Sequence, residues 1–102
     1  MKTTDIKTID IKTLKWFDKT YGNTYFAQEI TLNYGMPDAE TLYNPFQYGY
    51  SSYDYRAIEF LQKNGYFESE RVCAWTIKQK FGIIFRVNEQ SAKKRDLINI
   101  GK

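Results

Sequence analysis

Two segments of alternating polar and apolar residues, joined by a short loop, constrain the fold of this chain more than any other feature. The first covers residues 5–17 (DIKTIDIKTLKWF) and the second covers residues 24–34 (TYFAQEITLNY). The loop contains Gly22-Asn23, a pair that readily adopts positive φ. Period-two alternation on both sides of such a loop predicts a β-hairpin. One face of the second strand is apolar apart from Gln28, with Phe26, Ile30, Leu32 and Tyr34.

The first strand changes its apolar side near Thr13. Ile9 and Ile11 lie on one side of the strand, whereas Leu14 and Trp16 lie on the other. This change indicates a β-bulge near Thr13, or two half-strands in place of one flat strand.

A third strand is predicted after a turn at residues 35–40 (GMPDAE). It runs through residues 41–43 and resumes at residues 46–48. Pro45 lies between the two halves and has no N–H to donate. The strand is therefore either at the edge of the sheet or interrupted by a bulge at that point.

A helix is predicted to begin at Ser51, because Ser51 and Asp54 have the spacing of a capping box with Asp in place of the usual Glu. It ends at Asn64-Gly65, a typical C-cap pair. Tyr55 points away from the apolar side of this helix. The apolar residues at helical spacing are Tyr53, Ala57, Ile58, Phe60 and Leu61.

A second helix is predicted over residues 69–80, because Cys73, Ile77 and Phe81 recur at a spacing of four. An acid in the first turn and lysines in the last turn suit the dipole of such a helix. A strand over residues 72–77 is the alternative interpretation.

A further strand is predicted over residues 83–87, and the polar tail allows a last short strand near Leu97-Ile98. The elements then follow the order β-β-β-α-α-β. This order indicates an α+β fold, with two helices on one face of a mainly antiparallel sheet. A chain of 102 residues is expected to form a single domain over residues 1–102.

The sequence contains no catalytic motif. Histidine is absent, which removes Ser-His-Asp and Cys-His nucleophile activation and the commonest zinc ligand. Cys73, the only cysteine, is expected to be a buried small hydrophobe. The carboxylate pairs Glu68/Glu70 and Asp38/Glu40 lack a third acid and are expected to be solvated. We therefore expect a protein that is not an enzyme, with no cofactor and no metal site.

The sequence also predicts where the protein resides. Residues 1–10 (MKTTDIKTID) lack the apolar region of a secretory signal, and no apolar run approaches the length of a membrane span. A single cysteine cannot form an intramolecular disulfide. We expect a cytoplasmic protein without a membrane partner.

Aromatic residues make up 18% of the chain, and five of them fall between Phe46 and Tyr55. Tyrosine suits half-buried sites and interfaces, so this stretch is expected to be part core and part exposed surface. From Lys78 onward, five Lys and two Arg stand against two acids. Such a basic segment suits phosphate or an acidic protein face, although it is also typical of a solvated edge.

The residues predicted to bind a partner are the tyrosines outside the helix stripe and the cations that follow them. Nucleic-acid bases stack on such rings while cations contact phosphates, and Tyr and Arg also anchor protein interfaces. The signature of an RRM domain is missing, so only composition supports nucleic-acid binding. The predicted partner-binding residues are Tyr48, Tyr50, Tyr55, Arg56, Lys78, Lys80, Arg86, Lys93, Lys94 and Arg95.

The sequence resembles small uncharacterised proteins of phages and prophages. The resemblance is carried by a "WFD…GNTYF" hairpin, by the "PFQYGY" strand with the short helix after it, and by the "KKRDL" tail. Some small phage proteins of this size are anti-defence inhibitors, including anti-CRISPR proteins, which block a nuclease by binding it or its guide RNA. The resemblance assigns a role to no individual residue.

The resemblance and the composition together predict a non-catalytic binding protein of phage or mobile-element type. Its partner in the host cell would be a defence nuclease or a guide-RNA nucleoprotein. A free-standing single-stranded nucleic-acid-binding protein and a virion or assembly component are the alternatives. The oligomeric state stays open, and a homodimer is compatible with the exposed edges that long strands offer.

Overall fold

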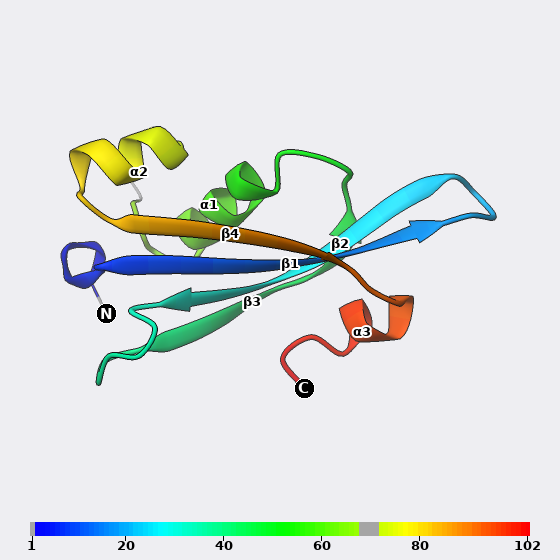
Figure 1. The fold of residues 1–102 in the computed structure, drawn as a ribbon, viewed down its shortest axis with the longest axis horizontal. Helices are drawn as coiled ribbons and strands as arrows, with labels where there is room; N and C mark the ends of the chain where they lie inside the picture. The colour runs from blue at the N-terminus through cyan, green and yellow to red at the C-terminus, as the bar shows by residue number, and fades with distance from the viewer. Residues whose placement is uncertain (1, 68–71) are drawn as a thin grey trace.

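Four strands form one mixed sheet in the computed structural model, which describes residues 2–67 and 72–102. The order across the sheet is β3-β2-β1-β4, with β1–β2 and β2–β3 antiparallel and β1–β4 parallel (Figure 1). The parallel pair arises because the chain crosses back through two helices before β4. The α+β class is confirmed. The strands are β1 (Thr8–Asp18), β2 (Asn23–Leu32), β3 (Glu40–Tyr48) and β4 (Ile84–Ser91).

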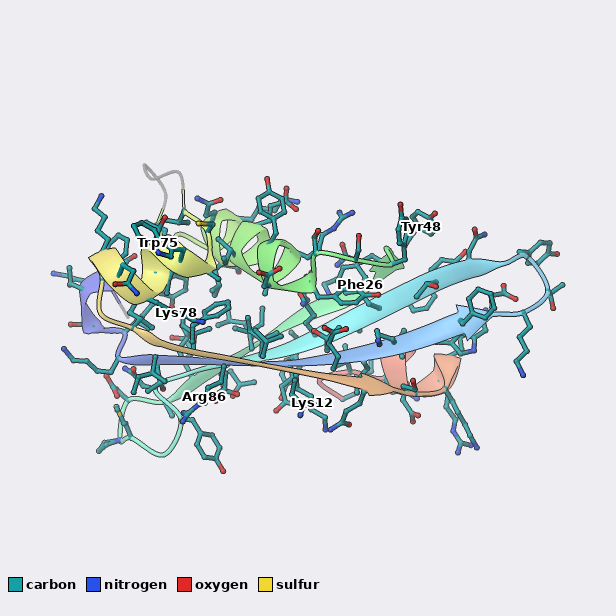
Figure 2. The ribbon with its side chains drawn as sticks, turned by 45° about the horizontal axis from the view of Figure 1, so that its top comes forward. Lys12, Phe26, Tyr48, Trp75, Lys78 and Arg86 are labelled. Atoms are coloured by element: carbon teal, nitrogen blue, oxygen red, sulfur yellow. The ribbon has the colours of Figure 1, made fainter. Side chains whose placement is uncertain are left out.

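The helices lie on both faces of the sheet, which differs from the prediction of one covered face. Helices α1 (Tyr53–Lys63) and α2 (Ala74–Lys80) lie on one face, and α3 (Lys94–Ile98) packs against the other (Figure 2). We call these two faces the α1 face and the α3 face. The element order is therefore β-β-β-α-α-β-α, and a short 3-10 turn at Thr3–Asp5 precedes it.

Helix α3 replaces the short strand predicted near Leu97-Ile98, which was wrong. The Asp96 carboxylate accepts a hydrogen bond from the Lys93 N–H at 3.1 Å and so satisfies a free donor at the start of the helix. Leu97 is completely buried against the sheet. This single turn is therefore anchored by one buried leucine and capped by one acid.

The position of α3 also explains why the apolar side of β1 changes near Thr13. The pairing of β1 with β2 is regular from Ile9–Leu32 to Asp18–Asn23, so the predicted bulge is absent. Ile9 and Ile11 face α1, whereas Leu14 and Trp16 lie on the α3 face and are half-buried. A single regular strand therefore contributes apolar side chains to a hydrophobic layer on each face of the sheet.

The main hydrophobic core lies between the sheet and the helices of the α1 face. Burial of apolar surface stabilises a protein by about 25 cal/mol per Å², and the main cluster of buried apolar residues belongs to this layer. The largest completely buried apolar side chains of this layer are Ile9, Phe26, Ile30, Leu32, Ile58, Leu61 and Ile77.

Helix α1 agrees with its predicted extent but begins differently. Its N-cap is Ser52, in the left-handed region with φ of 57°, and the Ser52 side chain makes no capping hydrogen bond. The predicted capping box from Ser51 is therefore wrong. Tyr53 is buried and Tyr55 is 53% exposed, which confirms their predicted orientations. The helix ends at Asn64 as predicted.

Helix α2 is shorter than predicted, because it begins at Ala74. Cys73 is the N-cap and is exposed, so its predicted burial is wrong. Ile77 is buried as predicted, and the alternative strand over residues 72–77 is excluded by the helix. The predicted start of the helix at residues 69–71 lies outside the described residues.

Pro45 acts as the sequence indicated. Strand β3 is at one edge of the sheet, and its pairing with β2 shifts register between Phe26 and Gln28, opposite the segment that contains Pro45. The shift places Asn44 on the α1 face and leaves Phe46 against Tyr25 on the α3 face.

A buried hydrogen-bond network centred on Gln28 joins β1, β2, β3 and α1. The Gln28 Nε2 donates to Thr13 Oγ1 at 3.1 Å and to the Tyr53 carbonyl at 2.8 Å. Its Oε1 accepts from Asn44 Nδ2 at 2.8 Å, and Asn44 Oδ1 accepts from Gln47. Gln28 and Thr13 are completely buried, so the three bonds of the Gln28 amide form away from water, whereas the bond from Gln47 to Asn44 is only partly buried.

Replacing Gln28 with Leu tests the importance of this network. The variant Gln28→Leu keeps the volume but leaves buried Asn44 Nδ2 and Thr13 Oγ1 without their partner. The cost of each orphaned polar group is about 1–3 kcal/mol. We expect the free energy of unfolding to fall by about 3 kcal/mol in urea denaturation.

The control is Gln47→Ala, which removes one partly exposed hydrogen bond of the same network. It is expected to cost less than about 1 kcal/mol. Equal losses in the two variants would contradict the central position of Gln28.

Candidate binding surface at the hairpin end

The turn end of the β1–β2 hairpin extends beyond the helices (Figure 1). The turn is held by Asp18, whose Oδ1 accepts from the Thr20 N–H at 2.9 Å and the Tyr21 N–H at 3.4 Å. Gly22 supplies the positive φ, 72°, that the turn requires. We define the hairpin end as residues 15–25 together with residues 46–50 and 91–95.

Aromatic rings cross three strands on the α3 face of the hairpin end. Trp16 and Tyr25 are stacked with centroids 5.7 Å apart, and Tyr25 is stacked with Phe46 at 5.1 Å. Tyr48 meets the Tyr25 ring edge-on at 5.9 Å. The Lys94 ammonium lies 5.5 Å from the centroid of Trp16, as in a cation–π contact.

This row of rings is mainly structural. Both faces of the Tyr25 ring are covered by its neighbours, and Lys94 lies over Trp16. A base can stack only on a free ring face. The row therefore stabilises the protruding strands and leaves Tyr48, 55% exposed at its margin, as the accessible ring.

A groove on the α1 face of the hairpin end holds exposed rings beside cations. Its volume is about 500 Å³. Phe17 is 55% exposed and Tyr50 is 70% exposed, and Lys15 and Lys19 line the same groove. A neighbouring hollow of about 470 Å³ shares Lys15 and Tyr50 and continues past Glu89.

Gly49 fixes the position of Tyr50 at this groove. The Gly49 N–H donates to the Thr24 carbonyl at 3.0 Å, and the Gly49 carbonyl accepts from the Tyr53 hydroxyl at 3.2 Å. A Cβ at Gly49 would lie 2.6 Å from the Phe26 ring, so only glycine lets the loop approach this closely. Burial raises the pKa of Tyr53, with a smaller contribution from Glu89. Its hydroxyl therefore stays protonated as the donor to Gly49.

The acids near the hairpin end are engaged within the protein. Glu89 pairs with Lys15 at 3.2 Å, Asp96 caps α3 and Asp18 caps the turn. Within the described part of the chain, no ion pair involves Lys19, Lys93 or Arg95. The hairpin end carries net positive charge, because it contains five cations and one acid, Asp18.

The structure gathers half of the predicted partner-binding residues at the hairpin end. Tyr48 and Tyr50 end β3 and begin the next loop, while the basic run 93–95 opens α3. The five residues brought together are Tyr48, Tyr50, Lys93, Lys94 and Arg95.

The other five predicted residues lie elsewhere. Tyr55 and Arg56 lie on α1, and Lys78 and Lys80 lie on α2, so these four belong to helices on the α1 face. Figure 2 shows Lys78 and Tyr48 toward opposite ends of the molecule. The structure therefore does not unite all ten residues in one surface.

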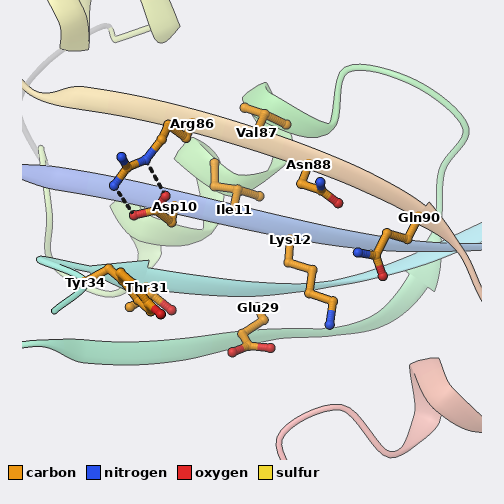
Figure 3. A pocket seen from close by; sticks show the side chains of 10 residues that line it. All are labelled: Asp10, Ile11, Lys12, Glu29, Thr31, Tyr34, Arg86, Val87, Asn88 and Gln90. Atoms are coloured by element: carbon orange, nitrogen blue, oxygen red, sulfur yellow. Dashed lines mark hydrogen bonds and ion pairs between the residues drawn. The ribbon is translucent and has the colours of Figure 1, made fainter.

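Arg86 lies on the α3 face of β4 and forms a bidentate ion pair with Asp10, at 2.6 and 3.0 Å (Figure 3). The hydrogen bond to Asp10 raises the pKa of the guanidinium. The surrounding groove, of about 450 Å³, also holds Lys12 and Glu29. The two cations, Arg86 and Lys12, are balanced by the two acids, Asp10 and Glu29, so this groove favours neither anionic nor cationic ligands.

The sequence alone did not single out Lys15, Phe17 and Lys19, which line the groove, or Trp16 and Tyr25, which belong to the stacked row. Trp16 and Phe17 read as parts of a core strand, because alternation cannot tell a covered face from a protruding one. One feature of the sequence could have indicated these rings. Trp16 and Phe17 are adjacent, so large rings lie on both faces of the strand at the end of the hairpin.

The predicted carboxylate pair Asp38/Glu40 has two separate structural roles. Asp38 Oδ2 accepts from Asn33 Nδ2 at 3.2 Å, and Glu40 Oε2 accepts from the Tyr66 hydroxyl at 3.2 Å. The pair Glu68/Glu70 lies outside the described residues. In residues 2–67 and 72–102 there is no group of three or more Cys, Asp or Glu residues able to hold a metal.

Comparison with known proteins gives no relative. No protein-family model matches the chain, and neither the curated proteins nor the solved structures contain a significant match. The resemblance to phage and prophage proteins therefore stays a prediction. No helix in the described ranges is long and apolar enough to span a membrane.

Two alanine variants separate the structural rings from the accessible ones. Tyr25→Ala removes the centre of the stacked row and is expected to lower the free energy of unfolding by about 2 kcal/mol. Tyr50→Ala is expected to change it by less than about 0.5 kcal/mol, since its side chain is mostly exposed. Urea denaturation of both variants measures the difference. A larger loss for Tyr50→Ala would contradict this division.

Proposed function

We propose that the protein is a non-catalytic binding protein of phage or mobile-element type that acts in the cytoplasm of the host cell. Its partner is a host defence nuclease or a guide-RNA nucleoprotein, and the hairpin end is the surface that binds it. The observation that carries this proposal is the set of exposed rings beside cations whose neighbouring acids are already engaged.

The charge of the hairpin end supports a partner with exposed phosphate or acidic side chains. Lys19, Lys93 and Arg95 are exposed and form no ion pair within the described residues. Positive charge near a phosphate-lined channel accelerates encounter and orients the partners. A guide-RNA nucleoprotein offers such a channel.

The exposed rings supply contacts that slow dissociation. Tyr48, Tyr50 and Phe17 are more than half exposed, yet they belong to segments fixed by hydrogen bonds and ring packing. Large rings on a rigid support lose little conformational entropy on binding and frequently act as hot spots. The partner would then be blocked by occupation of its surface, without any reaction.

Single-stranded nucleic acid is the second candidate partner. The observation in its favour is the groove of about 500 Å³, where Phe17 and Tyr50 accompany Lys15 and Lys19. Stacking contributes about 1–3 kcal/mol per base in proteins of this kind. Binding through phosphates would weaken steeply with salt because counterions are released.

Charge reversal at the start of α3 tests the proposal. The variant K93E/K94E/R95E, combined with Tyr48→Ala and Tyr50→Ala, removes much of the positive charge and two rings from the hairpin end. We expect inhibition of purified guide-loaded defence nucleases by the wild-type protein. The combined variant should need at least about tenfold more protein for the same inhibition, which corresponds to about 1.4 kcal/mol.

The matched control is K2E/K7E/K78E, which changes the net charge equally but alters exposed lysines outside the hairpin end. It should inhibit like the wild type. Inhibition that survives the combined variant, or that is lost equally in the control, would contradict the proposed surface.

Fluorescence anisotropy of labelled single-stranded RNA, single-stranded DNA and duplex DNA distinguishes the two candidates. Tight binding to free single strands that weakens steeply with salt would favour the second candidate. Absence of binding at low salt, together with inhibition of the nucleoprotein, would favour the first.

A further inference from the structure

The outer edge of β4 carries unpaired backbone groups. No strand in the described ranges pairs with β4 on the side away from β1 (Figure 1). The N–H groups of Ile84 and Ala92 donate to Lys7 and Lys15, so even-numbered residues bond toward β1. Because bonding alternates along a parallel ladder, the N–H and C=O groups of Phe85, Val87, Glu89 and Ser91 point outward.

The two edges of the sheet differ in their protection. Strand β3 carries Pro45 and a register shift, two devices that prevent a further strand from pairing. Strand β4 has neither a proline nor a shift in its register with β1 over all eight residues. The β3 edge is therefore protected against pairing with another strand, and the β4 edge is available for it.

The charges of β4 do not repel an identical strand. Arg86 pairs with Asp10 at 2.6 Å, and Glu89 pairs with Lys15 at 3.2 Å, so both are neutralised by β1 within the same sheet. Ile84 is 56% exposed and Val87 is 43% exposed, which leaves apolar surface along the edge. Grooves on both faces of the sheet reach Val87, so the strand is accessible from either side.

We propose that two copies of this chain pair through β4 in antiparallel orientation, around a two-fold axis at Val87, to form a continuous eight-stranded sheet. A two-fold axis perpendicular to the sheet leaves the α1 faces of both copies on the same side of the dimer. Odd-numbered residues of one β4 strand therefore pair with odd-numbered residues of the other, and even-numbered with even-numbered. The pairs are Val87 with Val87, Phe85 with Glu89, Arg86 with Asn88, and Ile84 with Gln90.

This register fits the backbone and the side chains together. The outward-bonding residues fall in hydrogen-bonded pairs, with Val87 at the centre. The two Val87 side chains cover each other on the α1 face, and no pair brings like charges opposite. The neutral edge and the self-complementary register are the reasons for choosing a second copy over a foreign strand.

The dimer would extend the proposed function but does not rest on it. Strand β1 runs parallel to β4, so antiparallel pairing directs the two hairpin ends in opposite directions. One dimer would thus present two copies of the binding surface and gain avidity on a partner with repeated sites.

Sedimentation equilibrium under reducing conditions tests the dimer. The chain has a mass of 12.1 kDa, and the wild type should approach twice this mass as its concentration rises. Val87→Pro should be monomeric, because it removes an outward N–H without removing a bond to β1. Val87→Thr keeps that N–H and a β-branched side chain, so it should remain dimeric. Val87→Lys places like charges at the axis and should also be monomeric, which covers the case in which the proline variant does not fold.

Cysteine pairs test the register directly. In a Cys73→Ser background, Ile84→Cys and Gln90→Cys chains should form a disulfide-linked dimer only when they are mixed. These positions form a non-hydrogen-bonded pair with Cα atoms about 4.5 Å apart, which suits a disulfide.

Three results would overturn the proposal. The first is a wild-type mass that stays at 12.1 kDa at every concentration. The second is a dimer that persists in both Val87→Pro and Val87→Lys. The third is disulfide crosslinking of either cysteine variant alone that is as strong as crosslinking of the mixture. The nucleoprotein inhibition of the wild type is measured separately, so either proposal can fail without the other.

Discussion

The arrangement of this protein depends on one buried amide. Gln28 lies in the middle of the sheet, where an apolar residue would be expected, and binds Thr13 of β1, Asn44 of β3 and the carbonyl of Tyr53 in α1. Burying a polar group costs free energy unless its hydrogen bonds are satisfied, so the amide favours the one relative position of these elements that satisfies it. It thereby fixes where α1 begins and how the preceding loop returns to the hairpin. The close approach of Gly49 to Phe26, and with it the position of Tyr50, follows from that constraint.

The second organising feature is a hairpin that is covered on both faces by different elements. The half of β1 near Ile9 packs against the helices of the α1 face, whereas Leu14 and Trp16 pack on the α3 face. Covering the α3 face in the half near the turn allows the strands to extend beyond the main core without exposing all of their apolar surface. The rings and cations left uncovered there, on Phe17, Tyr50 and the start of α3, form the surface that we propose for partner binding.

The local elements were largely predictable from sequence, and their assembly was not. Alternation around Gly22 gave the hairpin, and helical spacing from Tyr53 to Leu61 gave α1, because both signals are local. The sequence did not reveal the role of Gln28, since this residue interrupts an apolar face and its partners are 15 to 25 residues away along the chain. The single turn of α3 depends on one buried leucine, and five residues carry too little periodicity to reveal a helix. The proposed surface was only partly named from sequence, because composition pointed to Tyr50 and residues 93–95, while only the fold brings Lys15 and Phe17 beside Tyr50.

The two tryptophans of the chain allow the most direct test of the proposed surface. Trp16 lies at the hairpin end, whereas Trp75 lies on α2 and is exposed. Fluorine NMR of protein labelled with 5-fluorotryptophan gives one resonance for each, and Trp75→Phe assigns them. On titration with a guide-loaded nuclease, we expect the Trp16 resonance to shift or broaden well before that of Trp75. A response of Trp75 with Trp16 unchanged would contradict binding at the hairpin end and would move the proposed surface to the helices of the α1 face.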